Sequence, residues 1–177
     1  MGLDDQKERC VLDDHCKILL EQYKVYVPTA DKISDRRGDA NKFYITLLTG
    51  LLTLFSILIS IQKQIPVFMF ALISIAVLGV TLCWLWYKTI NSYAQLNSGK
   101  YIIINKIEDE LAFKCFDEEW TILGKGKDKK IYDKLTDVEK RVPWIFGIAY
   151  SVLLVVALGF IIYSYYPSIL HTLTLLF

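Results

Sequence analysis

Side chains that carry out chemistry in proteins are scarce in this sequence, which has two histidines, four cysteines and two methionines among 177 residues. The topology expected below places His15 and His171 on opposite sides of a membrane, so no Ser–His–Asp or Cys–His arrangement for nucleophilic catalysis is available. The cysteines show no paired spacing, and we expect no disulfide. These absences predict a protein that is not an enzyme and that uses no cofactor.

Motifs for metal ions and nucleotides are also lacking. Three potential metal ligands occur together in a frayed N-terminus, where they are a weak signal: Cys10, His15 and Cys16. The acidic residues at 108–110 and 117–119 are interpreted as a solvated face, with a divalent-ion site as the alternative. The segment GKGKDKK at 124–130 lacks the GxxxxGK[ST] pattern of a P-loop. We interpret it as a flexible basic loop that is solvated or touches anionic lipid.

Charged residues are absent from three long stretches, at 43–61, 65–87 and 142–163. The first has nineteen residues, of which twelve are Leu, Ile or Phe. As a helix it reaches about 28 Å, close to the thickness of a bilayer's hydrocarbon core. The sequence therefore predicts an all-α integral membrane protein with three transmembrane helices and helical cytosolic extensions.

Aromatic residues mark the ends of the second and third stretches, as is typical of a membrane–water interface. Trp84, Trp86 and Tyr87 come just before Lys88, and three tyrosines occur between 163 and 166. Pro167 is expected to end the third helix. The ten residues after it are too few to cross a bilayer, so we expect the tail to lie along the outer interface or to pack on a neighbour.

Lysine and arginine are nearly absent from one side of the expected membrane. Residues 1–42 contain eight of the twenty and residues 88–141 contain eleven, whereas the turn at 62–64 contains one and the tail at 164–177 none. The positive-inside rule then places the N-terminus and the central segment in the cytosol and the C-terminus outside. The two cytosolic segments also hold all nineteen acidic residues, and this balance argues against nucleic-acid binding.

Outside the membrane we expect further helices. Pro28 is expected to end a first helix, and Thr29 to cap a second one that runs into the first span. The second span is expected to continue as a helix to about residue 110. Residues 111–135 are expected to form a short structured excursion, and the capping box at 136–139 to start the last helix.

The absence of charge within the spans bears on transport. Pumps and coupled carriers usually need ionisable groups inside the membrane, and the three stretches contain no Asp, Glu, Lys, Arg or His. Three spans also cannot supply a pair of inverted repeats. Packing and assembly remain as the expected roles of these helices.

The first span carries its hydroxyl groups on one side. Steps of three and four residues separate Thr46, Thr49, Thr53, Ser56 and Ser60, so these five side chains lie on one seam of a helix. We call them the hydroxyl seam. One interpretation is that the seam packs against another helix, because Thr and Ser allow close approach. The alternative is that it lines a water-filled pore formed by several copies.

The stretch from 23 to 52, YKVYVPTADKISDRRGDANKFYITLLTGLL, resembles the opening of two groups of small bacterial membrane proteins. These are the RipA family of octameric membrane proteins and the SLATT group of two-span effectors from bacterial defence loci. The RipA-type resemblance extends to about residue 150, and the motifs that carry it further are Asn97, Lys100-Tyr101, Glu118-Glu119-Trp120, Leu135-Thr136-x-Val138-Glu139 and Val142-Pro143. The third span favours the RipA type, which implies an octamer.

Arg36 and Arg37 stand less than two turns before the first span, within reach of Asp31, Asp35 and Asp39. They are expected to anchor the helix at lipid headgroups or to form ion pairs between subunits. The expected partners are thus membrane lipids and further copies of the chain, with an unidentified small-molecule or protein trigger possible in principle.

Two functions are compatible with these observations. The first is a non-catalytic, scaffold-like homo-oligomer in the bacterial inner membrane. The alternative is a pore-forming or membrane-perturbing effector in bacterial defence or stress response, and a neighbouring gene for a nucleotidyltransferase or nucleotide sensor would favour it.

Overall fold

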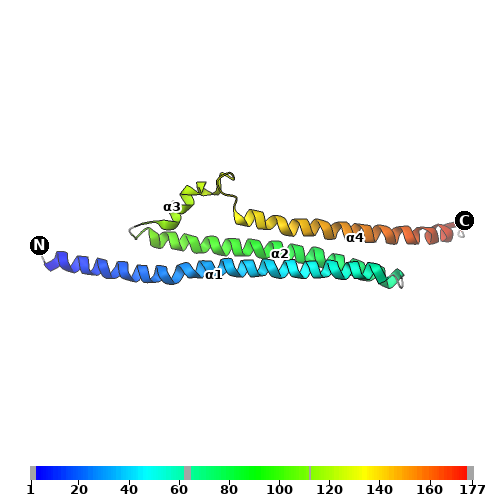
Figure 1. Ribbon diagram of the computed structural model, residues 1–177, viewed down its shortest axis with the longest axis horizontal. Helices are drawn as coiled ribbons and strands as arrows, with labels where there is room; N and C mark the ends of the chain where they lie inside the picture. Colours follow the sequence, from blue (N-terminus) through cyan, green and yellow to red (C-terminus); the bar gives the residue numbers. More distant parts are fainter. Residues whose placement is uncertain (1–2, 62–64, 112, 175–177) are drawn as a thin grey trace. The chain divides into compact units, whose positions relative to one another are not determined.

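Helices make up nearly all of the computed structural model, which describes the backbone of residues 3–61, 65–111 and 113–174 and the side chains of residues 14–60, 68–111 and 113–163 (Figure 1). The α-helices are α1 (Leu3–Ile61), α2 (Ile65–Glu108), α3 (Cys115–Ile122) and α4 (Leu135–Thr174), and a 3-10 turn, η1, spans Gly124–Gly126. The described residues contain no strand, which confirms the all-α prediction.

Three helical segments are long and apolar enough to cross a membrane, namely Asp14–Ser60, Phe68–Glu108 and Leu135–Tyr163. Each covers all or nearly all of one of the three charge-free stretches found in the sequence. The prediction of three spans is therefore confirmed by length and composition. The polar break predicted at residues 62–64 lies outside the described residues.

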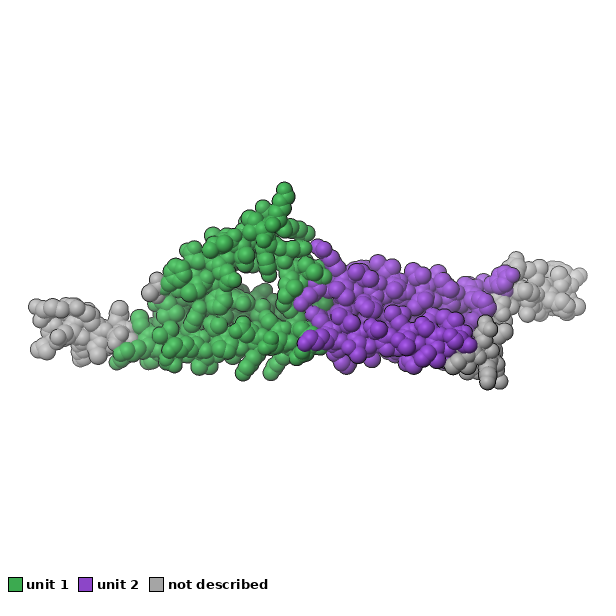
Figure 2. Space-filling model, in the orientation of Figure 1, with its two compact units in different colours: residues 1–39, 90–138 green, residues 40–89, 139–177 purple. Residues whose placement is uncertain are grey.

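The chain divides into two compact units, which are coloured separately in Figure 2. Unit 1 consists of residues 1–39 and 90–138, and unit 2 consists of residues 40–89 and 139–177. Unit 2 therefore holds the three charge-free stretches, and unit 1 holds most of the charged residues. In both units α1 and α2 run antiparallel and are joined by side-chain hydrogen bonds, Tyr23 to Glu108 in unit 1 and Trp86 to Asn41 in unit 2.

The first helix does not end at Pro28, so that prediction is wrong. The Thr29 hydroxyl does not cap a new helix but donates a 2.6 Å hydrogen bond to the Tyr26 carbonyl oxygen. Proline inside a helix costs about 3 kcal/mol. Burial of Ala30 and Ile33 in unit 1 offsets this cost, because helices in proteins are stabilised mainly by packing an apolar face. Tertiary packing therefore overrides the local signal.

The third long helix also continues past the residue expected to end it. Its bounds, Leu135–Thr174, include both Pro143 and Pro167. Proline is tolerated in membrane helices when neighbouring groups or local adjustments satisfy the freed carbonyl. The interfacial position of the segment after Pro167 stays a prediction, because its side chains lie outside the described residues.

The basic loop at 124–130 folds over an aromatic ring in unit 1. Gly124, Lys125 and Gly126 all have positive φ angles, 64°, 53° and 63°. A β-carbon at Gly126 would overlap the Lys134 side chain and lie 2.9 Å from the Trp120 ring. Both this crowding and the positive φ angle favour glycine at position 126. The loop predicted as flexible therefore contains a defined left-handed turn.

Candidate functional site

The ring of Tyr150 is fully buried in unit 2 and connects its three helices. The Tyr150 hydroxyl on α4 donates a 2.6 Å hydrogen bond to the Leu48 carbonyl oxygen on α1. The ring lies on the backbone of Gly79 in α2, where a β-carbon would overlap it. Ala76 and Cys83, one turn to either side of Gly79, are buried as well, so these three small residues form a narrow strip of helix contact on α2.

A second buried contact in unit 2 joins Trp86 to Asn41. The indole Nε1 donates a 2.8 Å hydrogen bond to Asn41 Oδ1. The ring of Tyr44 stacks on Trp86, with 5.7 Å between centroids. Trp86 is therefore a core residue, 1% exposed, and its assignment to an interfacial aromatic belt is wrong. Its neighbour Trp84, 58% exposed, faces outward as the sequence predicts.

The hydroxyl seam is uncovered within the chain, because all five of its side chains are exposed. Four of them donate hydrogen bonds of 2.7 to 3.1 Å to the backbone carbonyl four residues earlier, namely Thr49, Thr53, Ser56 and Ser60. The buried side of α1 in this unit carries Leu48 and Phe55. The helix thus packs on its own unit through apolar residues and leaves its small polar residues facing outward.

Unit 1 contains a buried carboxylate that the sequence analysis missed. Glu108 is 1% exposed. Its Oε1 accepts a 2.8 Å hydrogen bond from the Tyr23 hydroxyl, and both of its oxygens accept from the Phe116 backbone N–H at 3.2 Å. The end of α2 is thereby joined to α1 and to the first turn of α3. The acidic residues at 108–110 are only partly the solvated face that was predicted, since the first of the three points inward.

Burial and this carboxylate alter the acidity of the nearby phenols. Burial raises the pKa of Tyr23 well above its usual value, and the hydrogen bond and charge of Glu108 raise it further. The pKa of Tyr101 is also raised, first by burial and then by the charges of Asp31 and Glu119. Both shifts favour the neutral phenol, which in Tyr23 donates its proton to Glu108.

The structure places Arg36 and Arg37 in different surroundings. Arg36 is exposed, whereas Arg37 is 8% exposed and its Nη1 lies 3.4 Å from the Thr136 hydroxyl at the start of α4, within unit 1. Arg37 thus contacts the start of α4 within its own unit, whereas the Arg36 side chain is exposed on that unit. Anchoring at headgroups and ion pairing between subunits stay predictions.

Among the described residues, no three His, Cys, Asp or Glu side chains are grouped closely enough to hold a metal ion. His15 lies 3.0 Å from the Glu110 carboxylate instead, and Cys16 is exposed. The Cys10 side chain lies outside the described residues. The described side chains instead form contacts that join helices, around Glu108 in unit 1 and around Tyr150 in unit 2.

Comparison with known proteins agrees with this picture of packed membrane helices. A model of the octameric membrane protein family (8xMP) matches residues 20–159, which include the first two charge-free stretches, most of the third and the residues of the Glu108 contact. Searches of curated proteins and of solved structures found no match. The matched range covers well over half of the chain, so this three-span helical protein belongs to the octameric membrane protein family.

Proposed function

We propose that the protein is a non-catalytic, scaffold-like subunit of a homo-oligomer, an octamer by its family, and that the hydroxyl seam of α1 faces a neighbouring copy. The observation that carries this proposal is the exposure of all five seam side chains while the same helix buries Leu48 and Phe55. Small hydroxyl residues in a membrane let helix backbones approach closely, which favours a helix over lipid as their neighbour.

The proposed location is the bacterial inner membrane, with unit 1 in the cytosol and the C-terminus outside. The uneven distribution of basic residues supports this orientation, because nineteen of the twenty fall in segments assigned to one side. In that topology the Glu108 contact joins the two helical extensions on the cytosolic side.

A pore or membrane-perturbing effector is the second candidate, and the same exposed seam favours it. Several copies arranged with their seams inward would present hydroxyl oxygens to water, and the four hydrogen-bonded side chains would keep their oxygens accessible. The two candidates differ in what covers the seam, which is a helix in the first and water in the second.

Substitutions at Thr53 distinguish the two candidates. If the seam packs against a helix, Thr53→Val keeps the shape and costs little, whereas Thr53→Leu overpacks the contact and weakens assembly by about 1–3 kcal/mol. The matched control is Leu54→Phe, which also adds volume, at an exposed apolar position of the same helix. The oligomer's dissociation in detergent is the quantity to measure.

Cysteine labelling gives an independent result. In a cysteine-free background, Thr53→Cys in the assembled protein should react slowly with a water-soluble thiol reagent if a helix covers it. Fast labelling at 53 without labelling of Leu54→Cys, together with an intact oligomer for Thr53→Leu, would contradict the packing proposal and establish the pore.

A further inference from the structure

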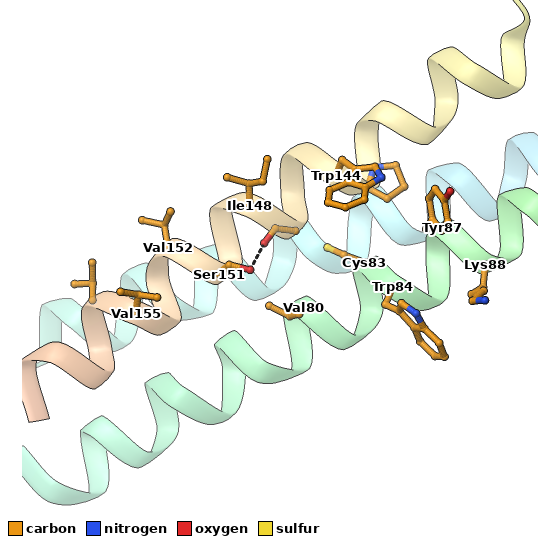
Figure 3. A pocket seen from close by; sticks show the side chains of 13 residues that line it. Val80, Cys83, Trp84, Tyr87, Lys88, Trp144, Ile148, Ser151, Val152 and Val155 are labelled. Carbon is orange, nitrogen blue, oxygen red and sulfur yellow. Dashed lines mark hydrogen bonds between the residues drawn. The ribbon is translucent and has the colours of Figure 1, made fainter.

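A groove of about 670 Å³ runs between α2 and α4 in unit 2, on a face that its own chain leaves open (Figure 3). Its lining is apolar along most of its length. The side chains that form its walls come from both helices and include Val80, Ile148, Val152, Val155 and Val156. Four of these are more than half exposed, so the unit itself does not fill the groove.

The floor of the groove presents no polar group that needs a hydrogen-bond partner from a ligand. Gly147 leaves α4 close to α2, with its position for a β-carbon 3.7 Å from the Cys83 β-carbon. The only hydroxyl drawn in the apolar part, that of Ser151, donates a 2.8 Å hydrogen bond to the Gly147 carbonyl, as Figure 3 shows. An apolar chain can therefore lie along this floor without leaving a buried donor unsatisfied.

One end of the groove is chemically different from the rest. Tyr87 and Trp144 meet there edge to face, 6.5 Å between centroids, and Lys88 belongs to the same lining. The Lys88 ammonium lies 5.7 Å from the centroid of the Trp84 ring, which holds the charge beside the groove. Aromatic rings and a cation next to an apolar channel match the headgroup and chain regions of a phospholipid.

The dimensions and charge fit one leaflet of a bilayer. Pro143 and Val156 are thirteen residues apart, so the groove extends about 20 Å along α4, slightly more than the ~15 Å of one leaflet's hydrocarbon. Lys88 is the first cation after the second charge-free stretch. In the proposed topology it stands at the cytosolic surface, where anionic headgroups concentrate.

We propose that this groove is a binding site for an anionic phospholipid, with acyl chain between α2 and α4 and phosphate at Lys88. The site uses surfaces other than the hydroxyl seam. It rests on the proposed orientation of Lys88 towards the cytosolic leaflet, but not on whether the seam packs or lines a pore.

Brominated lipids test the site, because bromine on the acyl chain quenches nearby tryptophan and both Trp84 and Trp144 border the groove. The full-length protein is reconstituted in bilayers in which either phosphatidylglycerol or phosphatidylcholine carries the bromine, at equal and increasing mole fractions. The site predicts about fivefold stronger apparent binding of phosphatidylglycerol, the effect of one lysine at a membrane surface. Lys88→Gln should abolish this preference.

Two further variants complete the test. Lys140→Gln removes a cation from the start of α4 that does not line the groove, and it should keep the preference. Val152→Phe narrows the apolar part from an exposed position and should weaken binding of phosphatidylglycerol while the circular dichroism of the helices is unchanged.

Equal quenching by both lipids in the unmodified protein, or an unchanged preference in Lys88→Gln, would overturn the proposal. Protection of the tryptophans from both lipids in the oligomer would also overturn it, since a second copy would then occupy the groove.

Discussion

The ring of Tyr150 occupies the place where a side chain at Gly79 would be. This relationship sets the distance between α2 and α4 in unit 2, and the hydrogen bond from the same residue to Leu48 adds α1 to the contact. One aromatic side chain and one missing side chain thus define how the three membrane helices pack. Single substitutions at either residue can test this contact.

Replacing Gly79 by alanine should destabilise unit 2, because the added methyl group overlaps a fully buried ring. We expect a loss of about 1–3 kcal/mol in the free energy of unfolding, measured by thermal or denaturant unfolding in detergent. Gly159→Ala is the matched control on α4, since a β-carbon there meets nothing within 4 Å. That control should be neutral or slightly stabilising. Equal effects at 79 and 159 would show that the ring moves aside freely.

Removing only the Tyr150 hydroxyl should have a smaller effect than removing the ring. Tyr150→Phe loses the hydrogen bond to the Leu48 carbonyl and should cost about 1 kcal/mol. Tyr150→Ala also leaves a cavity among three helices and should cost about 3–5 kcal/mol. The ratio of the two losses, from the same unfolding measurement, separates hydrogen bonding from packing. A larger loss for phenylalanine than for alanine would contradict the structure.

Unit 1 should lose stability at alkaline pH through Tyr23. Burial and Glu108 raise the pKa of this phenol above its usual value near 10, so the folded state favours the neutral form. This contribution is complete below the unfolded pKa and decreases as the pH rises above about 10 toward the folded value. The unfolding free energy should therefore fall more steeply above pH 10 in the unmodified protein than in Tyr23→Phe.

The two neighbouring arginines should respond differently to replacement by glutamine. Arg37→Gln removes a buried cation in contact with the start of α4 and should lower thermal stability in detergent. Arg36→Gln changes an exposed side chain and should leave unfolding within about 0.5 kcal/mol, with any effect confined to oligomer dissociation or lipid dependence. If Arg36→Gln were the more destabilising variant, the assignment of the two roles would have to be reversed.

Reporter fusions test the proposed orientation. A periplasmic reporter joined after Phe177 should be active, and the same reporter joined after Gly124 should be inactive, because nineteen of the twenty basic residues favour the cytosolic side. A cytosolic reporter at the two positions should give the opposite pattern. Activity of the periplasmic reporter at 124 would rule out the orientation with the N-terminus inside.

The sequence predicts the membrane helices well because charge is the quantity that a bilayer selects against, and charge is absent from all three stretches. It fails at Pro28, where burial of Ala30 and Ile33 outweighs the local cost of proline. It fails at Trp86 because Trp84 and Trp86 point to different sides of α2, and only the position of Asn41 on α1 shows which side is buried. No local pattern in the sequence gives that position. The burial of Glu108 could not be predicted for a similar reason. In the sequence it does not differ from its exposed acidic neighbours, and only the tertiary contacts with Tyr23 and Phe116 distinguish it.

The hydrogen bonds along the seam determine which atoms a neighbour meets. Thr49, Thr53, Ser56 and Ser60 each direct their proton inward, to a carbonyl of their own helix. What these four present outward is a column of oxygen lone pairs. Two such columns facing each other share no proton while these bonds are kept, so the four residues gain mainly van der Waals contact from an identical column. Stronger recognition needs an occupant that brings its own protons or positive charge, such as an amide, an indole or a partly dehydrated cation.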